Sequence, residues 1–148
     1  MDEHAALMDE ANRVRQALTI GDKKLAMQRL NRLAGHLQRH VQREEAGIFT
    51  ALRDMGEFLD ELNELETEHR QFHGVVTALD ASSADFDAEV MRLFDDLGGH
   101  VEREDLGIFP VSVVTLDESG WRLVESEHTK SPTFLLDDAA PADQVEGE

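Results

Sequence analysis

The chain has 148 residues, which is enough for one domain with a hydrophobic core but short for two. It contains no cysteine, so disulfides, thiolate-bound zinc, iron–sulfur clusters and cysteine nucleophiles are excluded. The formal net charge of −18 would repel nucleic acids and anionic lipids, so neither is expected as a partner. The acidic N-terminus lacks the apolar run of a signal peptide, and no stretch approaches the ~20 apolar residues of a membrane span. A cytoplasmic protein is therefore expected.

Apolar residues at three- and four-residue steps predict four long helices. Gly21 and Gly56 are expected to end the first and second helices, and Asp22 is expected to cap the second. Pro110 should stop the fourth helix or start a new element. The expected ranges are 2–20, 22–55, 57–79 and 85–109.

A short fifth helix, capped by Asp117 or Ser119, is predicted to pack over one end of the long helices. Short connections favour antiparallel neighbours, so the predicted fold is all-α, an up-down-up-down four-helix bundle with a C-terminal cap helix and an acidic tail. The bundle and cap helix would occupy residues 1–128, and residues 129–148 would form a disordered acidic tail. Within that tail, residues 134–136 are apolar enough to dock on the body.

One segment of the sequence occurs twice. Residues 40–49 are similar in sequence to residues 100–109, sixty positions later. In each copy a histidine is followed four residues later by a glutamate. That spacing puts the two side chains about 40° apart on one helical face. Between the copies, His69 and His73 have the same spacing.

The candidate ligands all fall on apolar helical stripes, where unsatisfied polar groups are costly. Imidazole and carboxylate donors on the inner faces of several helices indicate a metal site within the bundle. Without thiolate, such donors suit iron, manganese or zinc better than calcium or magnesium. The predicted metal ligands are His4, His40, Glu44, His69, His73, His100 and Glu104.

Seven donors are too many for one tetrahedral zinc and suit two ions that share bridging carboxylates. With a solvent bridge, they would fill about eleven of the twelve positions of two octahedra. The remaining position could take a diatomic ligand or peroxide.

In these residues the chain resembles a hemerythrin-like protein of the HHE cation-binding family. The resemblance covers about residues 2–109 and rests on the order of a single histidine, His-x-x-x-Glu, His-x-x-x-His and His-x-x-x-Glu on successive helices. It implies two non-heme iron ions joined by an oxo or hydroxo bridge. It also implies that His69, His73 and His100 hold one iron, whereas His4 and His40 hold the other, where oxygen or peroxide would bind. Glu44 and a carboxylate of the fourth helix would bridge the two ions.

The second bridging carboxylate has two candidates. Oxygen-carrying hemerythrins place an aspartate five residues after the fourth-helix histidine, where this chain has Asp105, whereas HHE-type proteins use the fourth residue, here Glu104. Glu104 stays on the stripe of an undistorted helix and matches Glu44 in the repeat, so it is the prediction, with Asp105 as its rival. His36 and His128 are not expected to be ligands.

The resemblance implies binding or sensing of oxygen or nitric oxide, or decomposition of hydrogen peroxide, so whether the protein is a catalase-like or peroxidatic enzyme stays open. One alternative is an iron-responsive regulatory or storage module without turnover. Another is a ferritin-like di-iron oxidase, suggested by the Glu-x-x-His spacing at Glu66 and His69 and again at Glu125 and His128.

Overall fold

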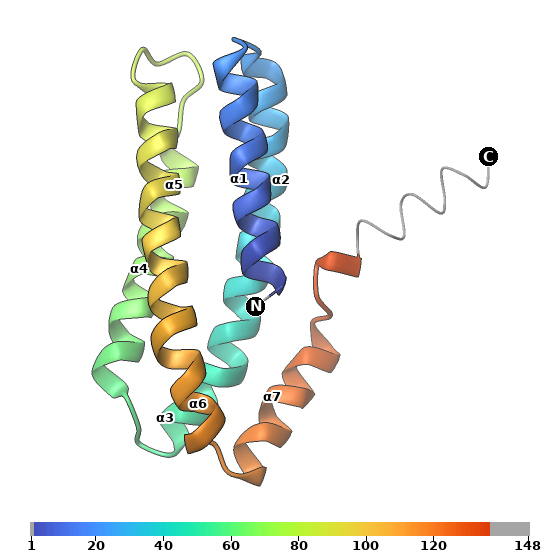
Figure 1. Cartoon of the computed structure of the whole chain (residues 1–148), viewed down its shortest axis with the longest axis vertical. Helices are drawn as coiled ribbons and strands as arrows, with labels where there is room; N and C mark the ends of the chain where they lie inside the picture. The colour runs from blue at the N-terminus through green and yellow to red at the C-terminus, as the bar shows by residue number, and fades with distance from the viewer. Residues whose placement is uncertain (1, 137–148) are drawn as a thin grey trace, which may run out of the picture.

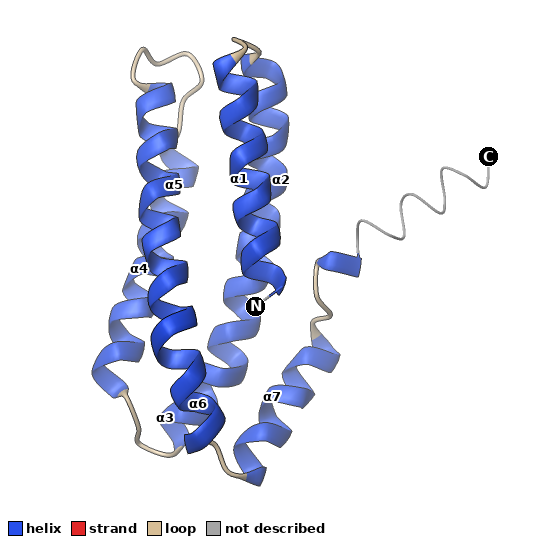
Figure 2. Ribbon diagram, viewed as in Figure 1, coloured by secondary structure: helices blue, strands red, loops and turns tan. Residues whose placement is uncertain are grey.

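The computed structural model describes residues 2–136, in which the regular secondary structure is helical (Figure 2). The four long helices are α1 (Asp2–Thr19), α2 (Lys23–Glu44), α4 (Leu59–Ala78) and α5 (Phe86–Arg103). The shorter elements are η1 (Glu45–Phe49), α3 (Thr50–Asp54), η2 (Glu104–Ile108), α6 (Phe109–Thr115) and α7 (Glu118–Lys130). The predicted all-helical fold is confirmed. None of the helices within residues 2–136 is both long and apolar enough to cross a membrane.

The helix ends follow the predicted chemistry. The side chain of Asp22 caps α2 by accepting a hydrogen bond from the Leu25 amide at 3.0 Å. Gly21 and Gly56 adopt positive φ angles of 79° and 73°, which glycine reaches without the Cβ clash of other residues. These two glycines therefore end α1 and α3 where the sequence predicted a stop.

Two π-helical turns, η1 and η2, interrupt the second and fourth predicted helices at equivalent places. Thr50 follows the first turn, and its hydroxyl donates to the Glu45 carbonyl at 2.6 Å. Pro110, sixty residues later, lacks the amide that a regular α-helical bond would need. Pro110 stands in the first turn of α6, which runs to Thr115, so of the two predicted roles it starts a new element and does not end the helical chain.

The first π turn changes which residues face the core. Ile48 was expected to continue the inner stripe of the second helix after Glu44, but it is only half-buried. Phe49 is fully buried instead, because the wide turn shifts the inward position by one residue. The fourth helix keeps its predicted stripe through Glu104 and Ile108.

The hydrophobic core has two parts. One cluster lies among α1, α2, α4 and α5, and the other lies among η1, α3, α4, η2, α6 and α7. In Figure 1, α1 lies beside α2 and α4 beside α5, and α7 packs on η1 and α3 near the end where the second and fourth helices change direction into α3 and α6. The polar residues of the predicted site lie between the two clusters.

The C-terminal part differs from the predicted tail. The predicted cap helix is present as α7, whose N-cap Asp117 accepts from the Gly120 amide at 2.8 Å. It continues to Lys130, and the following residues 131–136, here called the strap, place Phe134 in the core with 1% of its surface exposed. Phe134 is apolar and meets the ring of His36, which explains why the chain packs here although its helical periodicity has ended. The acidic residues 137–148 lie outside the described residues.

Candidate metal centre

Four buried histidines from the four long helices meet between the two core clusters. The Nε2 atoms of His4 on α1 and His40 on α2 are 3.0 Å apart. The Nε2 atoms of His69 on α4 and His100 on α5 are 3.1 Å apart. The predicted helices thus bring these four imidazoles together in two pairs.

Two buried carboxylates connect the pairs. Glu44 has one oxygen 2.9 Å from Nε2 of His40 and the other 3.3 Å from Nε2 of His69. Glu104 has one oxygen 3.1 Å from Nε2 of His4 and the other 3.3 Å from Nε2 of His100. Each carboxylate therefore presents one oxygen to each pair, which is the arrangement of a bridging ligand.

The donor atoms form two groups that share Glu44 and Glu104. In each group the possible ligand atoms lie within 4.8 Å of one another. The first group is His4, His40, Glu44 and Glu104, and the second is Glu44, His69, His100 and Glu104. We call this set of six residues the cage.

Each cage histidine has a further carboxylate at its Nδ1 atom, on the side of the ring that faces away from the cage. Because a carboxylate accepts, the Nδ1 atom of each imidazole donates to it, which directs the lone pair of Nε2 into the cage. The four contacts are His4 to Asp105 at 2.8 Å, His40 to Glu3 at 2.7 Å, His69 to Glu45 at 2.7 Å and His100 to Glu68 at 2.6 Å.

This arrangement fits cations. With Nδ1 protonated, the paired Nε2 lone pairs face each other across about 3 Å and would repel without a positive charge near them. One oxygen of Glu44 and both oxygens of Glu104 are buried without a hydrogen-bond partner. Such groups are costly to bury unless a cation binds them. The cage can therefore hold metal ions.

The charges of the cage favour positive charge inside it. Burial alone would lower the pKa of His4, but Glu104 and Glu44 outweigh that effect and raise the pKa to about 10. The same two carboxylates overcome burial at His69 and raise its pKa to about 10. For His40, Glu44 and Glu3 overcome burial and raise the pKa to about 9.

The carboxylates respond in the opposite sense. Burial would raise the pKa of Glu44, but His40, His4 and His69 hold it well below its usual range. Burial and Glu44 would also raise the pKa of Glu104, but the surrounding imidazoles lower it. Both carboxylates are therefore ionised and available as ligands at neutral pH.

The structure does not bring His73 into the cage. Its side chain is exposed on α4 and lines a groove of about 640 Å³ between α2 and α4. His73 lies one helical turn, about 6 Å, beyond His69, and at that level the cage carboxylates are no longer within reach. The structure thus places six of the seven predicted ligands together, and the assignment of His73 as a ligand stays a prediction.

Asp105 and Glu104 occupy different places. Glu104 is fully buried within both groups, whereas Asp105 is half-buried behind His4. The π turn at this point lets adjacent carboxylates face two different sides of the same imidazole, and Glu44 and Glu45 do the same for His69.

Of the carboxylates behind the histidines, Glu3, Glu45 and Glu68 are not among the ligands predicted from the sequence, and Asp105 is predicted there as the rival bridging ligand. Glu3 and Glu68 each precede a cage histidine in the sequence, and this repeated Glu-His dipeptide was the available signal. Burial would raise the pKa of Glu3, but His40, Thr133 and Arg43 lower it to about 2.

The remaining histidines lie elsewhere, as expected. His36 is buried one turn before His40 and pairs with Glu10 at 2.6 Å, whereas His128 is exposed on α7. The ferritin-like carboxylates also stay outside the cage, because Glu66 pairs with Arg53 and Glu125 is exposed.

Comparison with known proteins agrees with the site. The family model of the hemerythrin HHE cation binding domain matches residues 1–112, which include all six cage residues. No curated protein and no solved structure matches the chain. The match covers most of the chain and all of its cage, and the chain belongs to the hemerythrin HHE cation-binding domain family.

Proposed function

We propose that the cage holds two iron ions, one in each group, and that the protein binds oxygen, nitric oxide or peroxide there. The observation that carries the proposal is the pair of carboxylates, Glu44 and Glu104, each with one oxygen at each group. When bound, two bridged irons would supply one-electron redox steps and open positions for small ligands.

The protein's own residues would hold and tune the ions. His4, His40, His69 and His100 would be terminal ligands through Nε2, and the carboxylates at their Nδ1 atoms would keep each ring oriented and basic. With His73 outside, four imidazoles, two bridging carboxylates and a solvent bridge would fill about ten of twelve octahedral positions. Each ion would then keep one position for a small ligand.

Aromatic rings pack against three of the cage histidines. Phe109 stacks on His4 with ring centroids 5.4 Å apart, and Phe49 stacks on His69 at 5.7 Å. Phe72 meets the ring of His100 edge-on at 5.2 Å. Buried donors flanked by apolar rings favour small, weakly hydrated ligands such as diatomic molecules over bulky charged substrates.

The cage also supports the up-down-up-down arrangement of the long helices. His4 stands near the start of α1 and His40 near the end of α2, yet the two rings touch. His100, near the end of α5, likewise meets His69 of α4. Adjacent helices that alternate in direction would produce both contacts.

The proposal is tested by loading the metal-free protein with ferrous iron without air, followed by metal analysis and absorption spectra before and after oxygen. We expect about two ions per chain and a new visible band, in keeping with two octahedral sites. A band that reverses on degassing would indicate a carrier or sensor, and oxygen evolution from added peroxide would indicate a catalase-like enzyme. Uptake of fewer than about two ions would reject the di-iron site.

A further inference from the structure

The two halves of the repeat differ at the carboxylates behind His40 and His100. Glu3 accepts from His40 and from Arg43, just as Glu68 accepts from His100 and from Arg103. Glu3 has one further partner, the hydroxyl of Thr133, for which Glu68 has no equivalent among the hydrogen bonds of residues 2–136.

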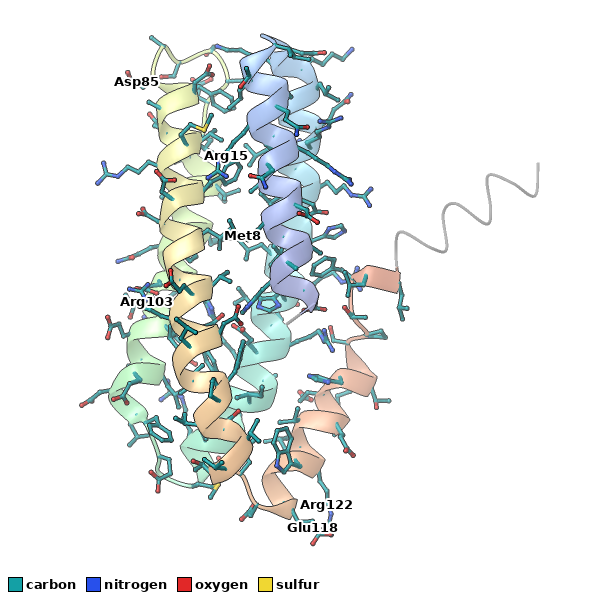
Figure 3. All side chains as sticks on the ribbon, viewed as in Figure 1. Met8, Arg15, Asp85, Arg103, Glu118 and Arg122 are labelled. Atoms are coloured by element: carbon teal, nitrogen blue, oxygen red, sulfur yellow. The ribbon has the colours of Figure 1, made fainter. Side chains whose placement is uncertain are left out.

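The extra contact comes from the strap, which covers the first half of the site. Side-chain exposure is 13% for Arg43 and 54% for Arg103, which is labelled in Figure 3. Glu3 is also less exposed than Glu68, at 9% against 17%. The same local motif is thus enclosed on one side of the cage and open on the other.

Contacts away from the cage hold the strap in place. The ring of Phe134 stacks on His36 with centroids 4.4 Å apart and an interplanar angle of 13°. Arg39 donates to the Pro132 carbonyl at 3.0 Å. Thr133 lies between Pro132 and Phe134, so contacts outside the cage hold its hydroxyl next to Glu3.

The strap also borders a cavity that reaches the cage. The cavity has a volume of about 350 Å³, and two of its lining residues are the cage members His40 and Glu44. Thr133 and Leu135 of the strap and His128 of α7 line it as well. These three residues lie beyond residue 112, where the family match ends.

We propose that the strap stabilises the metal group that contains His40. Thr133 is a positioning residue that fixes the His40 imidazole through Glu3, and Leu135 closes the cavity beside His40. This inference deepens the proposed function and rests on it. Its consequence is an asymmetric centre, in which the group containing His40 releases its metal more slowly than the group containing His100.

The test compares Thr133→Val, which removes the hydroxyl at nearly constant shape, with Thr133→Ser, which keeps it. Thr129→Val is the matched control, because Thr129 is exposed on α7 and its hydroxyl bonds within that helix. Each iron-loaded variant is mixed with the ferrous chelator ferrozine without air, and the release of iron is followed. We expect the slower release phase to accelerate about tenfold in Thr133→Val, with wild-type rates in Thr133→Ser and Thr129→Val.

A second measurement uses the metal-free protein. The imidazole NMR signals of His40 should shift in Thr133→Val, whereas those of His100 should stay in place. Leu135→Ala, which opens the cavity but keeps the hydrogen bond, should speed iron release and leave the His40 signals unchanged. Circular dichroism of each variant establishes that the helices are retained.

The outcomes separate the inference from the proposed function. Wild-type protein that takes up no iron would reject the proposed function and the asymmetric centre, while the His40 signals still report the positioning contact. Two irons in the wild type, with unchanged release and unchanged His40 signals in Thr133→Val, would overturn the inference alone.

Discussion

The hairpin of α1 and α2 and the hairpin of α4 and α5 carry equivalent histidines and glutamates, but neither contains a complete site. Asp105 of the second half holds His4 of the first, and Glu45 of the first half holds His69 of the second. The stacking rings also cross over, Phe109 onto His4 and Phe49 onto His69. The repeat therefore produces one interlocked centre in which each metal group needs both hairpins.

The halves also differ in one imidazole. Where the second half has His73, the first has Met8, which lies between α1 and α5 (Figure 3) and approaches Gly98 of α5. Because His73 is exposed, this difference does not reach the cage, and the two groups have matching donors. The main asymmetry comes instead from the strap.

Removal of a shared carboxylate should break both groups together. We expect Glu104→Gln to weaken iron binding by roughly a hundredfold or more, because each group loses an anionic oxygen and gains a neutral amide. Titration with iron, followed by metal analysis, measures the loss. Glu102→Gln, a change of an exposed neighbour, should bind like the wild type. Retention of one tightly bound ion in Glu104→Gln would show that the groups are independent.

Asp105 and Glu45, which each contact a histidine of the other half, provide a test with a smaller expected effect on both metal groups. Asp105→Asn and Glu45→Gln should each speed iron release about tenfold, because the neutral amide holds the imidazole less firmly and makes it less basic. Chelator competition measures the two rates. Similar effects from opposite halves would support the interlocked centre, and an effect from one variant alone would contradict it.

Removal of the metal should make stability depend on pH. His4, His40 and His69 have pKa values of about 10, 9 and 10 in the folded metal-free protein, above the usual 6.5. Their protonation therefore stabilises the fold fully below about pH 6.5, and this contribution is lost as pH rises through about 9 to 10. The melting temperature of metal-free protein should fall by several degrees from about pH 7 to about pH 10.

The iron-loaded protein is the control for this measurement. Metal binding replaces the protons on the imidazoles, so its melting temperature should change less over the same range. A metal-free protein that is equally stable at both ends of the range would show that these imidazoles are neutral in the cage.

The smallest effect is expected at His73. His73→Ala should leave iron binding within about twofold of the wild type, because the side chain is exposed outside both groups. His69→Ala, one turn away within the cage, should lose iron readily and serves as the positive control. A large loss of iron in His73→Ala would restore the seven-ligand site predicted from the sequence.

The sequence predicted the helices and the cage donors for one reason. Periodic apolar stripes define inner faces, and a polar residue such as His40 or Glu104 on such a face must be satisfied by something inside. Helix caps also depend on residues close together in the sequence, so the helix ends at Gly21 and Gly56 could be predicted from the sequence alone.

The parts that could not be predicted depend on contacts between distant segments. The first π turn changes the inward residue from Ile48 to Phe49, and a prediction from regular helical periodicity does not include such a shift. The partner of His4 is 101 residues away at Asp105, and Thr133 reaches Glu3 across 130 residues. Phe134 is buried because the end of α7 lies close to His36, and the amino-acid composition of this segment does not predict that position.

The first π turn also matters through its length. It holds one residue more than an ordinary helical turn, which moves the inward position after Glu44 from Ile48 to Phe49. Deleting one residue between Glu44 and Phe49 would therefore leave an ordinary turn with Phe49 still facing inward. It would remove the wide turn in which Glu44 and Glu45 contact two sides of His69. The length of this short stretch, as much as the identity of its side chains, thus shapes the contacts around the cage.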